Sequence, residues 1–352
     1  MMVLQHARPG LGLAALALLA ACDFPTKAPN WDMTWNVPAK STSISVNTFL
    51  PNGVTVTPSG TGFQTSVNAV TITRTLAGDC PACVAANGQT VPKPAFTSSG
   101  SGSATLPSAI TTATLSGDTL FATIQNGYNF DPIRPGAGNN GFIVIQVTSG
   151  STTIGKDSLN GATSSLAAGS TTTRKIPLSG NVSGASGVTV NVTVNSPAGD
   201  PVTINTAQSL TITGRGGSAT QGTVVFSSAT VSLNNQTVTS TPTDLNLDIS
   251  QDIRDRVQSG SLFLTIVNPF AITGNLTLTI AGGPSPVTKT VALAAGTSNV
   301  RVDFSQAEIR SVLAAKTLNF SGSIAGATAV TPGQQVSVSS RLQLTVTTKT
   351  TP

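Results

Sequence analysis

The chain is poor in the side chains that catalyse proton transfer. It holds one histidine, His6, and 13 acidic residues, of which a single one is glutamate, Glu308. General acid–base catalysis needs a histidine or a carboxyl group whose pKa lies near the working pH. No GxSxG motif marks a serine nucleophile either. We therefore expect no enzymatic activity, no catalytic residue, and no cofactor or metal ion.

Charge is also scarce, because Asp, Glu, Lys and Arg together make up only 9% of the 352 residues. The formal net charge is +5, and the basic residues are scattered, without a cluster and without interleaved aromatic residues. A nucleic-acid surface needs a basic stripe, to which single-strand binders add aromatic stacking platforms. The sequence thus argues against a nucleic-acid partner.

Abundant residues point to β-structure. Valine, isoleucine and leucine alternate with threonine and serine between turns that use the 34 glycines and 21 prolines. This pattern predicts strands with one apolar and one polar face, which pack as two-sheet sandwiches. The expected strands are 67–73, 120–124, 142–147, 188–194 and 210–212, then 224–233, 262–266, 276–280, 317–324, 335–338 and 342–347.

Similar segments recur along the chain. Leu120-Phe121 reappears as Leu262-Phe263, and the sequence LAAG at 166–169 reappears at 293–296. Either an internal duplication or chance similarity in a chain rich in Thr, Val and Gly accounts for this. We favour duplication, and we interpret residues 261–280 as a strand–turn–strand hairpin of the repeated unit.

The predicted organisation is therefore all-β, with two tandem related β-sandwich-like domains and one or two short helices. The domains are 41–213 and 223–352, joined by a glycine-rich linker at 214–222. A capping box of Ser305 and Glu308 predicts a helix at 306–316. A second helix is expected at 251–258.

The first residues have the pattern of an export signal. An apolar run at 11–18 leads into Leu19-Ala20-Ala21-Cys22. This resembles the lipobox of bacterial lipoproteins. The resemblance implies that 1–21 is a cleaved signal peptide, which removes His6, and that the thiol of Cys22 carries a lipid such as a palmitate-containing diacylglycerol. The alternative is an ordinary secretory signal with an unrelated cysteine.

If Cys22 is lipidated, the protein is anchored in the bacterial cell envelope and faces the periplasm or the cell exterior. Asp23 resembles the signal by which enteric bacteria retain lipoproteins in the inner membrane, so both the inner and the outer membrane stay open. Residues 22–40 are rich in proline and short polar residues and are expected to be a tether. Trp31 and Trp35 lie either at the membrane interface, in a partner's groove, or packed on the first domain; we favour packing.

Residues 262–302 carry a second resemblance. The segments LTIVNPF and KTVALAAGTSNVRV resemble the β-sandwich of water-stress and late-embryogenesis type-2 proteins, in which Asn-Pro follows the opening strand. The first half has Asn126-Gly127 instead of Asn268-Pro269. This resemblance implies a sandwich and names no ligand.

Cys80 and Cys83 form a CxxC motif. Because the mature chain would have no histidine and no other free cysteine to serve as ligands, a zinc site is not expected. A disulfide that pins a surface loop is the favoured interpretation in an oxidising compartment, with a redox pair or free thiols as alternatives.

The densest acidic run consists of Asp244, Asp248, Asp252 and Asp255. Because Arg254 and Arg256 interleave with it, a solvated helix face is favoured over a calcium site.

These observations predict a non-enzymatic, lipid-anchored cell-envelope protein that acts as a structural or binding module. Its partners would be the membrane and an envelope protein or glycan. The alternative is a carrier that holds lipid or another hydrophobic ligand between its two β-rich halves, which would need a cavity of several hundred Å³.

Overall fold

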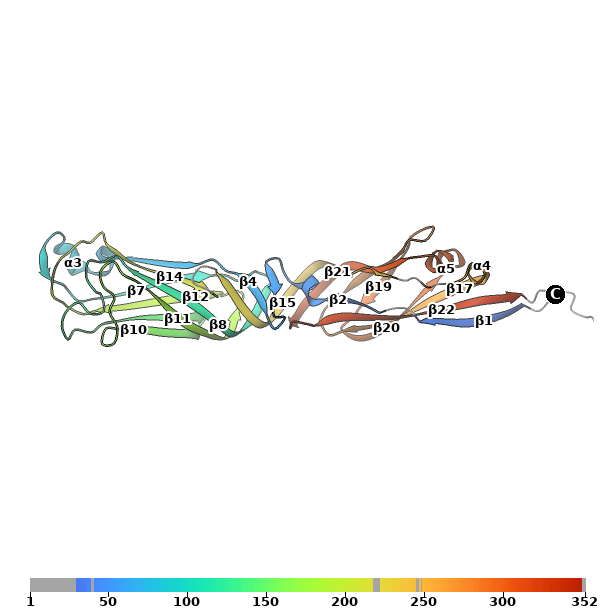
Figure 1. The fold of residues 1–352 in the computed structure, drawn as a ribbon, viewed down its shortest axis with the longest axis horizontal. Coiled ribbons are helices and arrows are strands. Elements are labelled where there is room, and N and C mark those ends of the chain that lie inside the picture. The colour runs from blue at the N-terminus through green and yellow to red at the C-terminus, as the bar shows by residue number, and fades with distance from the viewer. Residues whose placement is uncertain (1–29, 39–40, 218–221, 245–246, 248, 350–352) are drawn as a thin grey trace, which may run out of the picture.

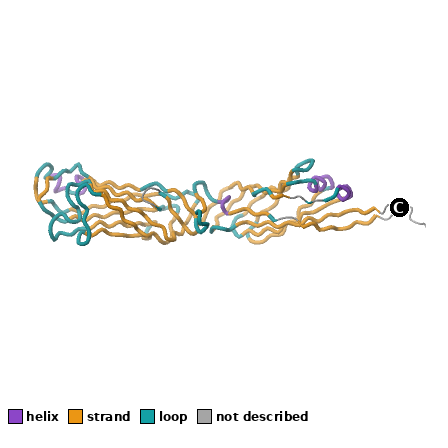
Figure 2. The backbone as a smooth tube through the Cα atoms, viewed as in Figure 1, coloured by secondary structure: helices purple, strands orange, loops and turns teal. Residues whose placement is uncertain are grey.

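The protein is an elongated rod built of β-strands (Figure 1). The computed structural model describes residues 30–38, 41–217, 222–244, 247 and 249–349. Strands dominate the rod, and the short helical segments lie near its two ends and its middle (Figure 2). The prediction of an all-β fold with short helices is confirmed.

The first half of the chain forms two antiparallel four-stranded sheets. One has the order β5-β14-β8-β11 and the other has the order β7-β12-β9-β10. These strands are β5 (Val70–Thr75), β7 (Phe96–Ala104), β8 (Ile110–Asn126), β9 (Phe142–Ser149), β10 (Thr152–Asn160), β11 (Thr171–Ser183), β12 (Val188–Ser196) and β14 (Ser209–Gly216).

The second half repeats this arrangement. Its sheets have the orders β1-β22-β17-β20, with β2 also on β22, and β15-β21-β18-β19. These strands are β1 (Asn30–Pro38), β2 (Thr42–Ser45), β15 (Thr223–Thr239), β17 (Val257–Asn268), β18 (Thr273–Ala281), β19 (Val287–Leu293), β20 (Gly296–Phe304), β21 (Thr317–Val330) and β22 (Gln335–Lys349). We number the eight strands of each half in chain order, with β1 and β2 counted as one strand. The two sheets of each half then have the strand orders 1-8-3-6 and 2-7-4-5, which is the strand order of a jelly roll.

Smaller elements complete the rod. A 3-10 helix, η1, and two short strands, β3 and β4, lie at the junction of the halves, and the pair β6–β13 lies near α3. Their bounds are η1 (Val46–Phe49), β3 (Val54–Val56), β4 (Phe63–Ser66), β6 (Thr90–Pro92), β13 (Pro201–Thr203), β16 (Thr243–Asp244), α2 (Leu76–Asp79), α3 (Pro81–Ala85), α4 (Gln251–Arg256) and α5 (Gln306–Leu313).

The two predicted helices are present and slightly shorter than expected. The hydroxyl of Ser305 accepts from the backbone N–H of Glu308, whose carboxylate accepts from the N–H of Ser305, so α5 begins with the expected capping box. Ile309, Val312 and Leu313 on one face of α5 are buried. The helix α4 begins after Ser250 and ends at Arg256, where the chain turns into β17.

The segment 261–280 is not a hairpin. Its alternation is as expected, with Leu264 and Leu278 buried, but β17 and β18 belong to opposite sheets. The chain therefore crosses the sandwich between them. Phe270 and Ile272 in the connection are 1% and 0% exposed, because a crossing segment contributes side chains to the core whereas a hairpin turn exposes them.

A buried asparagine holds each such crossing. The side-chain amide of Asn268 donates to the carbonyls of Ile272 and Ala294 (3.0 and 2.9 Å), and its oxygen accepts from the N–H of Phe270. At the matching position in the first half, Asn126 donates to the carbonyls of Phe130, Leu166 and Ala167 and accepts from the N–H of Tyr128. Each asparagine thus ties the crossing to the first residues of an LAAG turn.

The predicted tether is part of the fold where the structure describes it. Residues 30–38 form β1, which pairs with β22 from Asn30↔Lys349 to Pro38↔Arg341. The strand β2, which falls at the start of the predicted first domain, 41–213, also pairs with β22. Trp31 and Trp35 lie on β1 and are 61% and 42% exposed, so the favoured prediction that they pack on the first domain is wrong.

Where the structure describes it, the predicted linker at 214–222 also belongs to β-structure. Residues 214–216 end β14, Gly217 bridges Gly222, and β15 begins at Thr223. The strand β15 then pairs with β4, with β8 and with β21. Since β8 belongs to the first half and β21 to the second, one sheet of eleven strands runs through both halves.

We predict that the crossing asparagines contribute strongly to stability. Asn268→Ala leaves the carbonyls of Ile272 and Ala294 and the N–H of Phe270 without their partner, and each unsatisfied buried group costs about 1–3 kcal/mol. We expect the free energy of unfolding in urea to fall by about 3 kcal/mol. Asn126→Ala should cost at least as much. A control, Asn275→Ala on the exposed face of β18, should change stability by less than about 0.5 kcal/mol; equal losses in all three variants would contradict the role of the crossings.

Candidate functional site

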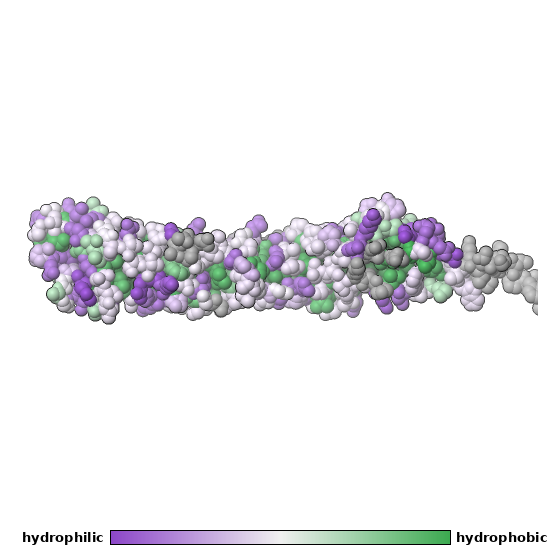
Figure 3. Space-filling view, viewed as in Figure 1, coloured by the Kyte–Doolittle hydropathy of each residue, from purple (hydrophilic) through white to green (hydrophobic). Residues whose placement is uncertain are grey.

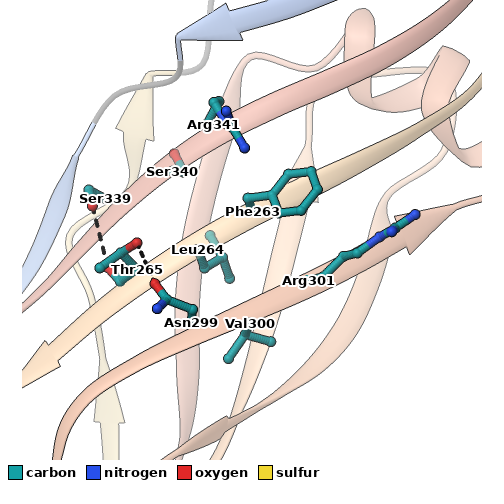
Figure 4. A pocket seen from close by; sticks show the side chains of 9 residues that line it. All are labelled: Phe263, Leu264, Thr265, Asn299, Val300, Arg301, Ser339, Ser340 and Arg341. Carbon is teal, nitrogen blue, oxygen red and sulfur yellow. Dashed lines mark hydrogen bonds between the residues drawn. The ribbon is translucent and has the colours of Figure 1, made fainter. Parts of the chain in front are cut away.

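An open hollow of about 620 Å³ lies on the outer face of the sheet formed by β22, β17 and β20. Phe263 on the middle strand lies opposite Arg341 of β22 and Arg301 of β20 in the antiparallel register. Residues opposite one another in antiparallel strands point to the same face, and Figure 4 shows Phe263 flanked by the two arginines. We call these three residues the Phe263 row.

The Phe263 row places two guanidinium groups against one aromatic ring. Their central carbons lie 5.0 Å (Arg341) and 5.6 Å (Arg301) from the ring centroid, within the range of cation–π attraction. Stacking of this kind holds long side chains in a defined position at little entropic cost. The ring thus orients both cations at the surface of the sheet.

The two cations differ in their partners. Arg301 pairs with Asp303 at 2.7 Å. Hydrogen bonds from the hydroxyl of Ser261 and then from Arg301 hold the pKa of Asp303 below its usual range, so this carboxylate is charged at neutral pH. None of the ion pairs found among the described residues includes Arg341. The row therefore carries one positive charge that is not balanced by a neighbouring carboxylate.

Uncharged polar groups form the next row along the strands. Thr265 lies between Asn299 and Ser339, and its hydroxyl donates to the side-chain oxygen of Asn299 at 2.8 Å. The hydroxyl of Ser339 donates to the carbonyl of Thr265 at 3.4 Å (Figure 4). Arginine, asparagine and hydroxyl groups can bind an anionic, hydroxyl-rich ligand.

The same kind of row occurs in the first half. Phe121 on β8 lies opposite Lys175 of β11 and Arg215 of β14. The ammonium of Lys175 lies 5.7 Å from the ring centroid of Phe121. Phe121 and Phe263 are the residues that the sequence comparison had matched, but their cationic neighbours are distant in sequence. Only the strand pairing reveals that both rings are flanked by cations.

The cysteine pair lies at the opposite end of the rod from β1 (Figure 1). The sulfur atoms of Cys80 and Cys83 are at bonding distance, as the disulfide prediction requires. Two details differ from the expected surface loop: Cys80 and Cys83 are 1% and 0% exposed, and Cys80 caps the short helix α3. Cys80 lies between α2 and α3, so the buried disulfide has a structural role at this end of the rod.

A buried lysine near this disulfide-bearing end was not predicted from the sequence. Lys93 is 1% exposed, its ammonium donates to the carbonyl of Pro197, and it lies 4.7 and 5.4 Å from the ring centroids of Phe96 and Phe130. Burial lowers the pKa of Lys93 to about 7, although the carbonyl and the rings favour the charged form. A lone lysine between two prolines carries no recognisable pattern, so sequence reasoning had no means of finding it.

The acidic run behaves as a solvated face where it is described. Asp252 pairs with Arg256 at 2.9 Å, and Asp255 accepts from the amide of Gln251. Asp248 lies outside the described residues. Over the described part of the chain, no three Asp, Glu, His or Cys side chains come together in a way that would hold a metal ion.

Cys22, the predicted lipidation site, also lies outside the described residues. Among those that are described, no helix is long and apolar enough to span a bilayer.

No protein-family model matches the chain, and no curated protein matches it. Among solved structures, a protein described as secreted, from Parabacteroides distasonis, is 7% identical with a TM-score of 0.35, over 89% of this chain and 99% of that one. A cowpea mosaic virus particle protein scores 0.22 at 11% identity, covering 85% and 93% of the two chains. The tandem CBM22 domains of Paenibacillus barcinonensis Xyn10C score 0.15 at 8% identity, covering 89% and 99%. Similarities this low support no conclusion about function.

The buried lysine predicts a pH dependence of stability. Between pH 7 and about 10 the unfolded chain keeps the proton on Lys93 while the folded protein loses it. Since the unfolded state then binds more protons, stability should rise with pH, by at most about 1.4 kcal/mol per pH unit. We expect urea midpoints to increase from pH 7 to pH 9.

Lys93→Met removes the titrating group and should flatten this rise. Lys156→Met, which removes an exposed lysine of β10, should leave it intact. A wild-type slope no steeper than that of Lys93→Met would contradict the assignment.

Proposed function

We propose that the protein is a non-enzymatic, lipid-anchored component of a bacterial cell envelope that acts as a binding module. The observation that carries this proposal is the position of its parts along the rod. Asn30, eight residues after Cys22, lies at one end with the C-terminal strand, whereas the disulfide of Cys80 and Cys83 lies at the other. An acylated Cys22 would attach the rod by one end and present its sheets and far end away from the bilayer.

The chemistry of the hollow supports binding rather than catalysis. Its polar side chains are Arg301, Arg341, Asn299, Thr265 and serines, none of which is a general base at neutral pH. Export with removal of residues 1–21 would also leave a chain without histidine. The protein would then face the periplasm or the cell exterior from the inner or the outer membrane.

For the ligand we propose an acidic glycan of the envelope. Guanidinium groups bind carboxylates through charge-assisted hydrogen bonds, and the adjoining Asn299 and Thr265 offer partners for sugar hydroxyls. The ring of Phe263 holds the cations in place and is flanked by them, so it is not a free stacking platform. Carboxylates along a polymer would therefore contact the row through Arg341 and Arg301.

The alternative of a lipid carrier receives less support. A space lined by Leu120, Val190 and other apolar residues between the sheets of the first half has a volume of about 30 Å³. This is close to the volume of one water molecule and far below the several hundred Å³ that pockets for small ligands occupy. A space of this size does not hold a lipid, which favours a binding module whose ligand contacts lie on its outer faces.

We predict that Arg341→Gln weakens binding to a polyuronate such as polygalacturonate about tenfold, because one charge-assisted hydrogen bond is worth roughly 1.5–3 kcal/mol. Isothermal titration of the purified protein measures this, and binding should weaken as salt is added. Neutral dextran should bind less tightly than the polyuronate.

Two further variants give this experiment its controls. Lys156→Gln removes the same charge from an exposed site outside both rows and should bind like the wild type. Lys175→Gln tests the row around Phe121. If Arg341→Gln and Lys156→Gln bind equally well, the Phe263 row is not the ligand site.

The anchor makes a separate prediction. The intact mass of protein extracted from its native membrane should correspond to a chain that begins at Cys22 and carries acyl groups. Cys22→Ser should abolish the acyl mass, whereas Cys80→Ser with Cys83→Ser should retain it. An unmodified chain that begins elsewhere would overturn the lipid anchor.

A further inference from the structure

One strand at the end of the rod exposes an unusual set of side chains. Trp31, Met33 and Trp35 occupy alternate positions of β1 and are 61%, 58% and 42% exposed. Alternate residues of a strand share one face. Large apolar side chains at adjacent positions of one face form a patch, in contrast to single exposed apolar residues, which are common on any surface.

This face continues the core side of the sheet beyond the core. Met33 and Trp35 lie opposite Val346 and Leu344 of β22, which are 8% and 0% exposed. An open, largely apolar groove of about 340 Å³ runs between β1, the end of β22 and Ile253 of α4. Figure 3 shows apolar surface near this end of the rod.

The other face of β1 is polar, and its side chains form hydrogen bonds with those of β22. The hydroxyl of Thr347 donates to Asp32 at 2.7 Å, and the amide of Gln343 donates to Asn36. The ribbon of β1 and the end of β22 is therefore amphipathic, with its tryptophans on the apolar face. A ribbon of this kind is suited to a boundary between water and an apolar phase.

The end of the described chain places this patch close to the predicted anchor. Seven residues, 23–29, separate Cys22 from Asn30, so eight Cα–Cα steps join the two and span at most about 29 Å when fully extended. The patch begins at Trp31. A lipid on Cys22 thus holds Trp31 and Trp35 within a few nanometres of the headgroups, whatever path those residues take.

We propose that the apolar face of β1, formed by Trp31, Met33 and Trp35, lies in the headgroup region of the bilayer to which Cys22 is attached. Tryptophan concentrates at membrane interfaces because its ring is apolar while its N–H bonds to water and headgroups. This inference rests on the lipid anchor of the proposed function. It adds a second contact, which fixes the tilt and rotation of the rod that a lipid chain alone leaves free.

A second copy of the chain fits this face less well. Stable interfaces bury about 800 Å² on each partner with 20–30 residues a side, whereas the patch consists of three side chains at the tip of a ribbon. The bilayer needs no complementary surface. It is also brought to the patch by covalent attachment.

The chain offers a direct test, because Trp31 and Trp35 are its two tryptophans. Intrinsic tryptophan fluorescence therefore reports on this face alone. Acylated protein, verified by intact mass, is reconstituted into vesicles of phosphatidylethanolamine and phosphatidylglycerol in which part of the lipid carries bromine on its acyl chains. We expect about half of the emission to be quenched by brominated lipid, together with protection from aqueous iodide.

Trp31→Phe and Trp35→Phe each leave one reporter and assign the contact to a position. The tryptophan that remains in each variant should be quenched by brominated lipid. Trp31, which remains in Trp35→Phe, should be quenched at least as strongly as Trp35, because it is nearer to the anchor. Emission that iodide quenches fully and brominated lipid does not would overturn the inference while the verified acyl mass keeps the anchor intact.

Two other outcomes identify a different occupant. Protection from iodide in dilute protein without vesicles would mean that the chain's own residues cover the patch. Protection that increases with protein concentration, with a dimer in sedimentation, would mean that a second copy covers it. Both results overturn bilayer contact, whereas a missing acyl group defeats the anchor itself.

Discussion

The hydrogen bonds between β15 and β8 are the constraint on which the rod depends. They join residues 226–231 of the second half to residues 110–115 of the first, and the same strand β15 continues into its pairing with β21. Backbone groups buried in a sheet must be paired, so the two sandwiches cannot separate at this point without losing a whole ladder. A flexible linker would leave the two ends of the molecule free to approach each other. The shared sheet keeps the disulfide-bearing end and β1 at opposite ends, and the proposals about function use that separation.

The strands predicted from alternation are present, but β10, β11, β19 and β20 were not predicted, and alternation was a poor guide to which strands pair. The buried residues of β17 and β18 follow the predicted pattern, yet the two strands lie in different sheets, because Phe270 and Ile272 between them enter the core. The strand β7 was not predicted, because it lacks apolar alternation. Its inward positions include Gly100 and Gly102, where an added Cβ would lie 2.9 Å from Ile72 and 2.6 Å from Val70. Close packing of the two sheets requires small residues there, so the strand has no apolar alternation to read.

The candidate site shows the same limit. Phe263 belongs to a predicted strand, but Arg301 and Arg341 join it only through pairings with β20 and β22. Lys93 became notable only through its burial. Local patterns such as the capping box of α5 and the CxxC pair were predictable because all their members lie within four residues. Contacts between distant segments depend on which strands pair, and that is set by the packing of the whole sandwich.

Features that recur in both halves bear on the suggested duplication. Both have the same strand order, a buried asparagine at the crossing after the third strand, and a phenylalanine between two cations on that strand. Gly169 and Gly296, which end the two LAAG turns, both have positive φ, of 71° and 81°. An alternating pattern rich in Thr and Val can arise by chance, whereas a duplication would account for these matches together.

The two cationic rows stand out because charged residues are scarce in this chain. Charged residues make up only 9% of the chain, and although Arg301 is paired with Asp303, none of the ion pairs among the described residues includes Arg341. A positive group on an otherwise uncharged surface attracts anions over about a Debye length, roughly 8 Å at physiological salt. The Phe263 row lies in the half that carries β1, and the Phe121 row lies in the half farther from it. The two rows belong to different sheets, the Phe263 row to the sheet of β17 and the Phe121 row to the eleven-stranded sheet, so under the proposed function each row would be a separate binding surface.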